Sequence, residues 1–263
     1  MRIFILAAGT GSRLYPLTKD TPKSLLDIGN GDCLLGRQLH AIEESGMFSD
    51  AVIITGYRGE QIESWLDRRD SAFPVRTLFN PFFASTNNLV SLWCARHLMR
   101  ERDFAITNGD NLYQPGVLRD AACRARPNAI SITLSHKPAY DDDDMKVMLD
   151  AANCVRRIGK TLPAAQASAE SVGLAFIKGA GMRERFIDTL ERLLRDADYL
   201  NRFWLETFNR LVERAVPVHT VDIHADDWAE MDFHPDIETL RQRLSEALLK
   251  TAAPAPRRAT VNE

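Results

Sequence analysis

The sequence contains no run of apolar residues long enough to cross a membrane, which takes about 20 residues. Its first apolar stretch, Ile3 to Ala8, passes directly into a polar, glycine-rich segment and lacks the cleavage site of a signal peptide. We therefore expect a cytoplasmic protein that has no membrane partner.

Cysteines are few, and basic residues form no long block. The four cysteines, Cys33, Cys94, Cys123 and Cys154, make no C-x-x-C pair, so we expect neither a zinc site nor a disulfide framework. The formal net charge is -3, which argues against a nucleic-acid partner. With 45% hydrophobic and 26% charged residues, the composition is that of a globular protein.

Short apolar runs alternate with amphipathic segments in the first half of the chain. The runs are typical of buried strands, and the segments between them have helical spacing. Strands are expected at 3–6, 51–55, 75–79 and 104–107, and helices at 35–45, 60–69 and 89–99. This alternation predicts an α/β fold with a Rossmann-like, doubly wound and mostly parallel sheet.

The second half is richer in predicted strands. They are expected at 129–135, 146–149, 155–158, 171–177 and 218–223, and helices at 182–195, 201–214 and 235–250. The strands at 146–149 and 155–158 should form a hairpin within a small β-rich insertion. We expect a single domain over residues 1–250 and a disordered tail over 251–263.

The segment that follows the first strand, residues 7–26, is irregular and positively charged. It leaves the carboxyl edge of the sheet, where open α/β folds bind ligands. Gly9 and Gly11 allow close approach of the backbone to an anion, and Arg13 and Lys23 add charge. The spacing is neither a Walker A loop nor a dinucleotide fingerprint, because position 14 is leucine. A phosphate-binding loop is indicated, although G-x-G by itself also fits a structural turn.

Three acidic residues are candidates for one metal site. Asp110 follows a predicted strand at the same sheet edge, where it also fits a plain turn. Glu230 and Asp232 are two residues apart, so in an extended segment their carboxylates point the same way. Carboxylate oxygens suit Mg²⁺. An acidic collar at the start of the last helix is the alternative, and it fits Asp236 and Glu238 better.

The polar and aromatic residues further along the chain suggest substrate contacts. Asn87 and Asn88 could bind a base or a ribose, but Asn88 also fits as a helix cap. Trp204 and Glu206, on a predicted helix, could recognise an amine, and Trp228 could form another wall of the same binding site. Trp204 fits the protein core equally well.

The string LAAGTGSRLYPLT, followed by TPKSLL, resembles the signature of nucleotidyltransferases that activate sugar phosphates and related phosphoryl alcohols. The resemblance implies that the loop wraps the triphosphate of a nucleotide, while Arg13 and Lys23 stabilise the pyrophosphate and the α-phosphate. It assigns Asp110 and Asp232 to Mg²⁺, with Glu230 beside them. The loop residues are Leu6, Ala7, Ala8, Gly9, Thr10 and Gly11.

The string NPFFASTNNLVSLWCA resembles a subgroup that contains cytidylyltransferases acting on phosphocholine and on 2-aminoethylphosphonate. In related enzymes M-K-V, here at Lys146, looks like the lysine that holds the phosphoryl group of the acceptor. A lysine facing inward on a strand also needs an anion nearby. The string ESVG, which begins at Glu170, resembles the substrate-binding strand.

The resemblance implies transfer of CMP from CTP to a phosphorylated or phosphonylated amino alcohol. Residues 1–128 would form the nucleotide-binding half and residues 129–250 the acceptor-binding half. The alternatives are a sugar-1-phosphate enzyme that uses UTP, dTTP or GTP, and a catalytically silent nucleotide-binding subunit. The sequence leaves the acceptor and the oligomeric state open, with a homodimer as one option.

Overall fold

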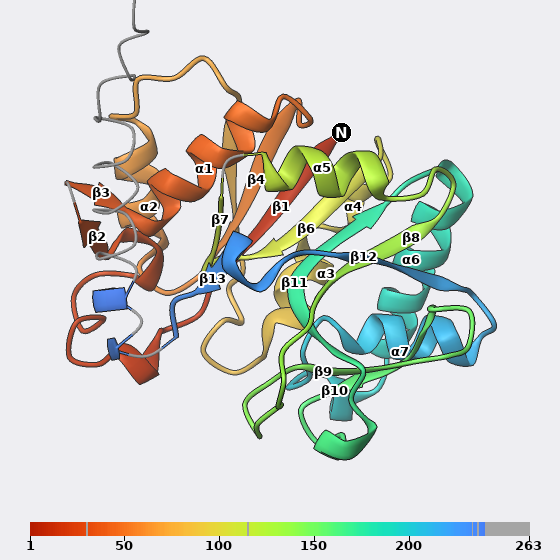
Figure 1. Cartoon of the computed structure of the whole chain (residues 1–263). Coiled ribbons are helices and arrows are strands. Elements are labelled where there is room, and N and C mark those ends of the chain that lie inside the picture. The colour runs from red at the N-terminus through yellow and green to blue at the C-terminus, as the bar shows by residue number, and fades with distance from the viewer. Residues whose placement is uncertain (30, 115, 233, 236, 240–263) are drawn as a thin grey trace, which may run out of the picture.

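A nine-stranded sheet runs through the centre of the protein (Figure 1). The structure is a computed structural model that describes residues 1–29, 31–114, 116–232, 234–235 and 237–239. The predicted helix at 235–250 falls largely outside these residues, and the predicted tail at 251–263 falls entirely outside them. No helix in the described ranges is long and apolar enough to span a bilayer.

The first half of the chain forms the parallel part of the sheet. Its strands lie in the order β5-β4-β1-β6, and each neighbouring pair is parallel. They are β1 (Arg2–Ala7), β4 (Asp50–Thr55), β5 (Val75–Phe79) and β6 (Phe104–Asn108). This confirms the predicted α/β class and the mostly parallel character of the sheet.

The second half extends the sheet beyond β6. Here β11 runs antiparallel to β6, β8 and β9, while β12 pairs with β8 in parallel. The predicted hairpin is present as β9 and β10. The strands are β8 (Ile130–Ser135), β9 (Lys146–Leu149), β10 (Val155–Gly159), β11 (Ala169–Ile177) and β12 (Val218–Asp222).

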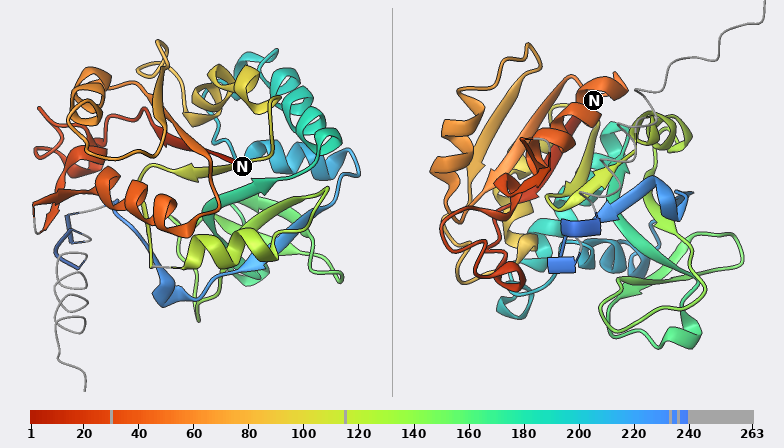
Figure 2. Two further views of the ribbon diagram at one scale, coloured as in Figure 1. Left: turned by 90° about the horizontal axis from the view of Figure 1, so that it is seen from above. Right: turned by 60° about the vertical axis from the view of Figure 1, so that its left-hand side comes forward.

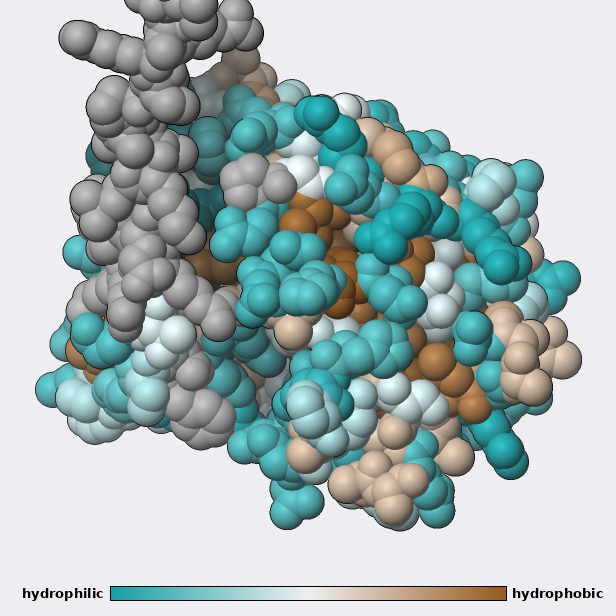
Figure 3. Space-filling model, viewed as in Figure 1, coloured by the Kyte–Doolittle hydropathy of each residue, from teal (hydrophilic) through white to brown (hydrophobic). Residues whose placement is uncertain are grey.

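Helices cover both faces of the sheet (Figure 2). One face packs against α1 (Leu34–Ser45), α2 (Gly59–Leu66) and α5 (Val117–Arg124). The other face packs against α3 (Asn88–Cys94), α4 (Arg96–Met99), α6 (Ala180–Leu193) and α7 (Glu206–Glu213). On the side seen in Figure 3, apolar residues reach the surface mainly in hollows between hydrophilic ones.

Three helices differ from the prediction. The expected helix at 89–99 is divided at Ala95 into α3 and α4. α7 begins at Glu206 instead of residue 201, so Trp204 precedes the helix. α5 was not predicted, because alanines supply half of its buried face and they carry little hydrophobic signal.

Two small ribbons lie outside the main sheet. One joins β2 (Asp27–Gly29) to β3 (Asp32–Cys33), and the other joins β7 (Asn111–Tyr113) to β13 (Trp228–Glu230). The second ribbon pairs residues more than 100 positions apart in the chain, and it places the end of β13 beside the end of β6.

Gly173 bends β11 at the point where it passes the sheet edge. Its φ is +73°, and a Cβ atom there would lie 2.3 Å from Nδ2 of Asn108 and 3.2 Å from Nδ2 of Asn111. The pairing of β11 with β8 shifts register between Ser171 and Ala175. Glycine is needed here for both its backbone conformation and its lack of a side chain.

We expect Gly173→Ala to lower the free energy of unfolding by about 2 kcal/mol or more, because it adds left-handed backbone strain to overpacking. Gly159→Ala in β10 is the matched control, since a Cβ there meets nothing within 4 Å. Urea denaturation measures both variants. Equal stabilities for the two would contradict this account of the bend.

Candidate functional site

Two cavities meet at the carboxyl ends of β1 and β6. The loop-side cavity, about 480 Å³, lies against the segment after β1, and the sheet-side cavity, about 460 Å³, lies against β11. Both are lined by Leu6, Arg13, Gly109, Asp110, Phe203 and Asp232. A ligand in one cavity therefore touches the same polar groups as a ligand in the other.

Three carboxylates converge at this boundary. Oxygen atoms of Asp110, Glu230 and Asp232 lie within 4.8 Å of one another. The β7–β13 ribbon brings them together, because Glu230 pairs with Asn111 and the amide of Met231 donates to the carbonyl of Asp110 at 3.0 Å. The three acidic residues proposed from the sequence thus form one cluster.

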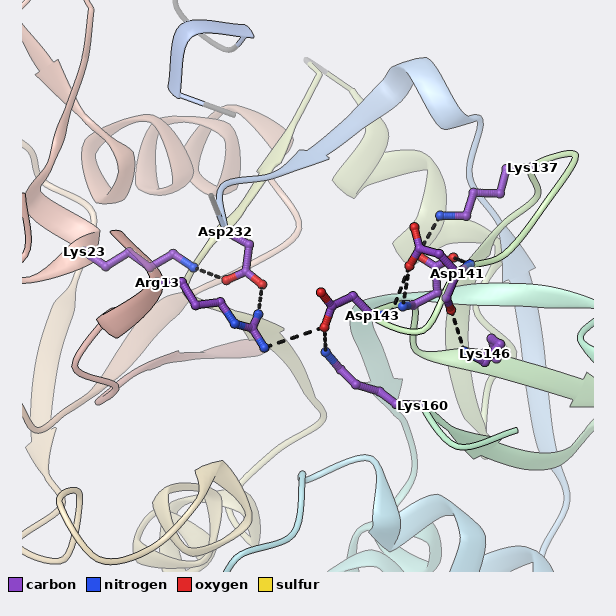
Figure 4. A network of polar contacts seen from close by, with 9 residues as sticks. Arg13, Lys23, Lys137, Asp141, Asp143, Lys146, Lys160 and Asp232 are labelled. Atoms are coloured by element: carbon purple, nitrogen blue, oxygen red, sulfur yellow. Dashed lines mark hydrogen bonds and ion pairs between the residues drawn. The ribbon is translucent and has the colours of Figure 1, made fainter. Parts of the chain in front are cut away.

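Two cations from the N-terminal segment reach this cluster (Figure 4). Lys23 Nζ lies 2.8 Å from Asp110 Oδ2 and 2.9 Å from Asp232 Oδ1, and Arg13 also pairs with Asp232. Burial opposes the charge of Lys23, but the two carboxylates outweigh it and raise the pKa of the amine. Burial likewise opposes the charge of Asp232, but Lys23 and Arg13 lower the pKa of its carboxyl group.

The cluster still has acceptor capacity that the protein leaves unused. Oδ1 of Asp110 is buried and has no hydrogen-bond partner among the described residues. Removal from water and repulsion by Asp110 and Asp232 raise the pKa of Glu230 to about 8. An additional cation would give Asp110 Oδ1 a partner and reduce the repulsion that raises the pKa of Glu230. Hard oxygen ligands suit a divalent ion. The residues present therefore fit a divalent metal.

The segment after β1 forms one wall of the loop-side cavity. Gly11 has φ +64°, and a Cβ atom there would lie 2.9 Å from Cγ2 of Thr18, whereas the space beside Gly9 is open. The predicted loop residues Leu6, Ala7, Gly9, Thr10 and Gly11 all line the cavity. Ala8 lies behind them, where its carbonyl accepts from the amide of Tyr57 at 3.1 Å.

The two asparagines have different partners. Asn87 caps α3, because its side chain accepts from the amide of Asn88 at 2.7 Å. Asn88 Oδ1 accepts from the amide of Trp204 at 2.8 Å. The alternative in which Asn88 caps the helix is therefore wrong by one residue. Asn87 lines the loop-side cavity and Asn88 the sheet-side cavity.

The aromatic candidates divide between core and cavity. Trp204 is 1% exposed and packs against Phe208 with 5.4 Å between ring centroids. Its indole nitrogen donates to Asn108 Oδ1 at 2.9 Å. Trp204 still borders the sheet-side cavity, together with Trp228. Glu206 lies elsewhere, in a neighbouring chamber.

The lysine positions differ from the sequence-based expectation. Lys146 is buried, and its Nζ donates to the carbonyl of Asp141 at 2.5 Å. It is not among the described residues that line either cavity, so its contact with an acceptor stays a prediction. Lys137 and Lys160 line the sheet-side cavity instead. Sequence reasoning missed both, although K-P after β8 and G-K after β10 were visible signals.

The acidic loop at 141–144 closes one side of the sheet-side cavity (Figure 4). Lys137 Nζ lies 2.6 Å from Asp144 Oδ1 and 3.0 Å from Glu170 Oε2, so this lysine links the loop to β11. Asp143 projects toward the loop-side wall, where it lies 3.8 Å from Arg13 and 3.3 Å from Lys160. Arg13 therefore contacts carboxylates from both ends of the site.

Comparison with known proteins matches residues 3–146, more than half of the chain, to the nucleotidyl transferase family. The chain belongs to this family. Nucleotidyl transferases are enzymes, and the carboxylate cluster lies where the matched segment meets the C-terminal strand β13.

Two curated relatives in this family align over most of the chain. CTP:phosphoglutamine cytidylyltransferase of Campylobacter jejuni is 24% identical over 90% of this chain and 98% of its own length. 2-Aminoethylphosphonate cytidylyltransferase of Lancefieldella rimae is 26% identical over 87% of each. The solved structure of CTP:phosphocholine cytidylyltransferase from Streptococcus pneumoniae has a TM-score of 0.72 at 22% identity, and covers 92% of this chain and 98% of that one. These similarities agree with the subgroup suggested by the sequence.

We expect Glu230→Gln to flatten the pH dependence of stability when EDTA is present. The raised pKa keeps the proton on Glu230 up to about pH 8 in the folded protein, whereas the unfolded chain loses it near the ordinary glutamate pKa of 4.5. The folded state binds more protons in that window, so the free energy of unfolding falls as the pH rises through it. Thermal unfolding from pH 5 to pH 9 measures the effect.

Glu60→Gln, on the exposed start of α2, is the control for loss of one carboxylate. The wild type and this control should lose more stability than Glu230→Gln as the pH rises. Three parallel curves would contradict the raised pKa of Glu230.

Proposed function

We propose that the protein transfers CMP from CTP to a phosphorylated or phosphonylated amino alcohol and releases pyrophosphate. The observation that carries this proposal is the position of the carboxylate cluster, with Lys23 and Arg13, on the boundary that two cavities share. Group transfer requires two ligands to meet at one centre of concentrated charge. The relatives, named as cytidylyltransferases, support CTP as the donor.

The nucleotide occupies the loop-side cavity in this proposal. Backbone amides of the segment around Gly9 and Gly11 contact the phosphates, and Asn87, which lines this cavity, contacts the nucleoside. Asn88 lines the sheet-side cavity instead, so its predicted contact with the nucleotide stays a prediction. Arg13 and Lys23 neutralise the charge that develops on the pyrophosphate. The half formed by residues 1–128 thus binds the donor, and the half formed by 129–250 binds the acceptor.

The reaction is an in-line displacement at the α-phosphorus. An anionic oxygen of the acceptor forms a bond to this phosphorus as the bond to the β-phosphate oxygen breaks, and pyrophosphate leaves. The acceptor oxygen carries its charge at neutral pH, so the protein needs no general base. Asp110, Glu230 and Asp232 would hold Mg²⁺, which when bound polarises the phosphate oxygens.

The acceptor occupies the sheet-side cavity. Lys160 lies at its edge, close to Arg13, and is well placed to hold the phosphoryl group. Aromatic walls at Trp228 and Phe203 and the carboxylates of the acidic loop suit a cationic group on the same molecule. This combination favours an acceptor that carries both a phosphoryl group and an amine.

A grid of CTP, UTP, dTTP and GTP against phosphocholine, 2-aminoethylphosphonate and glucose 1-phosphate tests the proposal. We expect pyrophosphate release with CTP and an amino-alcohol acceptor. Release only with a sugar phosphate, or with none of the acceptors, would contradict it.

Asp110→Ala should lower kcat by about 100-fold or more while the circular dichroism spectrum is retained. Asp120→Ala, at the exposed start of α5 and outside both cavities, is the control.

A pair of variants separates the two candidate acceptor lysines. Lys160→Met should raise the KM of the acceptor about tenfold and that of CTP much less, because Lys160 lines the sheet-side cavity. Lys146→Met should act mainly on stability, since its amine supports the carbonyl of Asp141. A selective rise in acceptor KM for Lys146→Met alone would reverse the assignment.

A further inference from the structure

A third chamber, of about 420 Å³, adjoins the sheet-side cavity. The two share a border formed by Met145, Lys160, Phe203 and Leu205. The chamber is lined by the end of β10, the turn that follows it, and the segment that leads into α7. An acceptor held at Lys160 therefore has room to extend away from the carboxylate cluster.

The cations that line the three cavities are nearly all paired. Lys23, Arg13, Lys137 and Lys160 contact acidic side chains at the site, and Arg157 of the chamber lies 3.5 Å from Glu213. Arg202 is the exception: it is exposed at the edge of the chamber, and within the described part of the chain its guanidinium group makes no hydrogen bond or ion pair. An arginine fork that faces a cavity is suited to a carboxylate.

A carboxylate of fixed orientation lines the same chamber. Glu206 begins α7, and its Oε2 accepts from Nδ2 of Asn209 at 2.7 Å. Asn209 is itself buried and held by the backbone of Ile158 in β10. Glu206 is thus positioned by the core, and its carboxylate carries a negative charge at the chamber wall. Asp196 and Asp198 also line the chamber, together with Arg157 and Lys160, so charged groups of both signs surround Arg202 and Glu206.

We propose that the acceptor carries an α-amino-acid end, with an ammonium and a carboxylate group on one carbon, and that this end occupies the third chamber. The carboxylate pairs with Arg202, and the ammonium pairs with Glu206 in place of the acidic loop of the sheet-side cavity, while the phosphoryl group stays at Lys160. This inference rests on the proposed function and narrows its substrate class from amino alcohols to amino-acid phosphates.

Matched acceptors test this inference. O-phospho-L-serine differs from phosphoethanolamine by one carboxylate, and O-phospho-L-homoserine differs in the same way from 3-aminopropyl phosphate. We expect the carboxylate to raise kcat/KM with CTP at least tenfold in one of these pairs. Activity with CTP in which the carboxylate brings no such advantage in either pair would overturn the proposal.

Two variants locate the effect in the chamber. Arg202→Gln should lower kcat/KM for the carboxylated acceptors at least tenfold more than for their counterparts. Gly159→Val should do the same, because Gly159 lines the chamber and a Cβ there enters open space. Arg195→Gln, on an exposed arginine outside the lining, is the control. Equal losses with both members of each pair would overturn the assignment.

Calorimetric binding of the four acceptors separates this inference from the proposed function. If pyrophosphate is released with CTP but the carboxylate brings no advantage, the inference fails and the proposed function stands. If no acceptor supports pyrophosphate release, the proposed function fails. The inference is then judged by whether wild type binds the carboxylated acceptors at least tenfold more tightly, and whether Arg202→Gln removes that difference.

Discussion

The bridge from Lys23 to Asp110 and Asp232 is the contact on which the site depends. It joins three segments that are far apart in the chain: the irregular segment after β1, the end of β6, and the residues after β13. Three carboxylates this close repel one another, and the raised pKa of Glu230 records part of that cost. The positive charge of Lys23 offsets part of this repulsion, and a bound divalent cation would offset the rest.

This concentration of charge explains how the two cavities are related. The parallel strands bring the glycine-containing segment after β1 and Asp110 to one edge, while the β7–β13 ribbon carries Glu230 and Asp232 to the same place. Arg13 then reaches toward Asp143 of the acidic loop on the far side. Arg13 therefore links carboxylates on the two sides of the site, an arrangement that suits the proposed transfer of a group between two anions.

Much of this arrangement could be predicted from local sequence. The buried strands, the glycines of the loop and the two-residue spacing of Glu230 and Asp232 are short-range patterns. The structure contains the strands and brings the two carboxylates together, and the glycines line a cavity, while their contact with phosphate stays a prediction. What could not be predicted depends on distant contacts. The amide of Trp204 bonds to Asn88 just before α7 begins, and the β7–β13 ribbon joins widely separated segments. Lys160 follows a glycine at the end of β10, but that local signal does not say which cavity the lysine lines, and the folded chain does.

The central claim is that one divalent cation, bound by the carboxylate cluster, serves both cavities. Anomalous diffraction from crystals soaked with Mn²⁺ and CTP tests it most directly. The account predicts a single strong peak in contact with the carboxylates of Asp110 and Asp232, between the loop-side and sheet-side cavities. A peak bound only elsewhere, or none at this cluster in the presence of CTP, would contradict it.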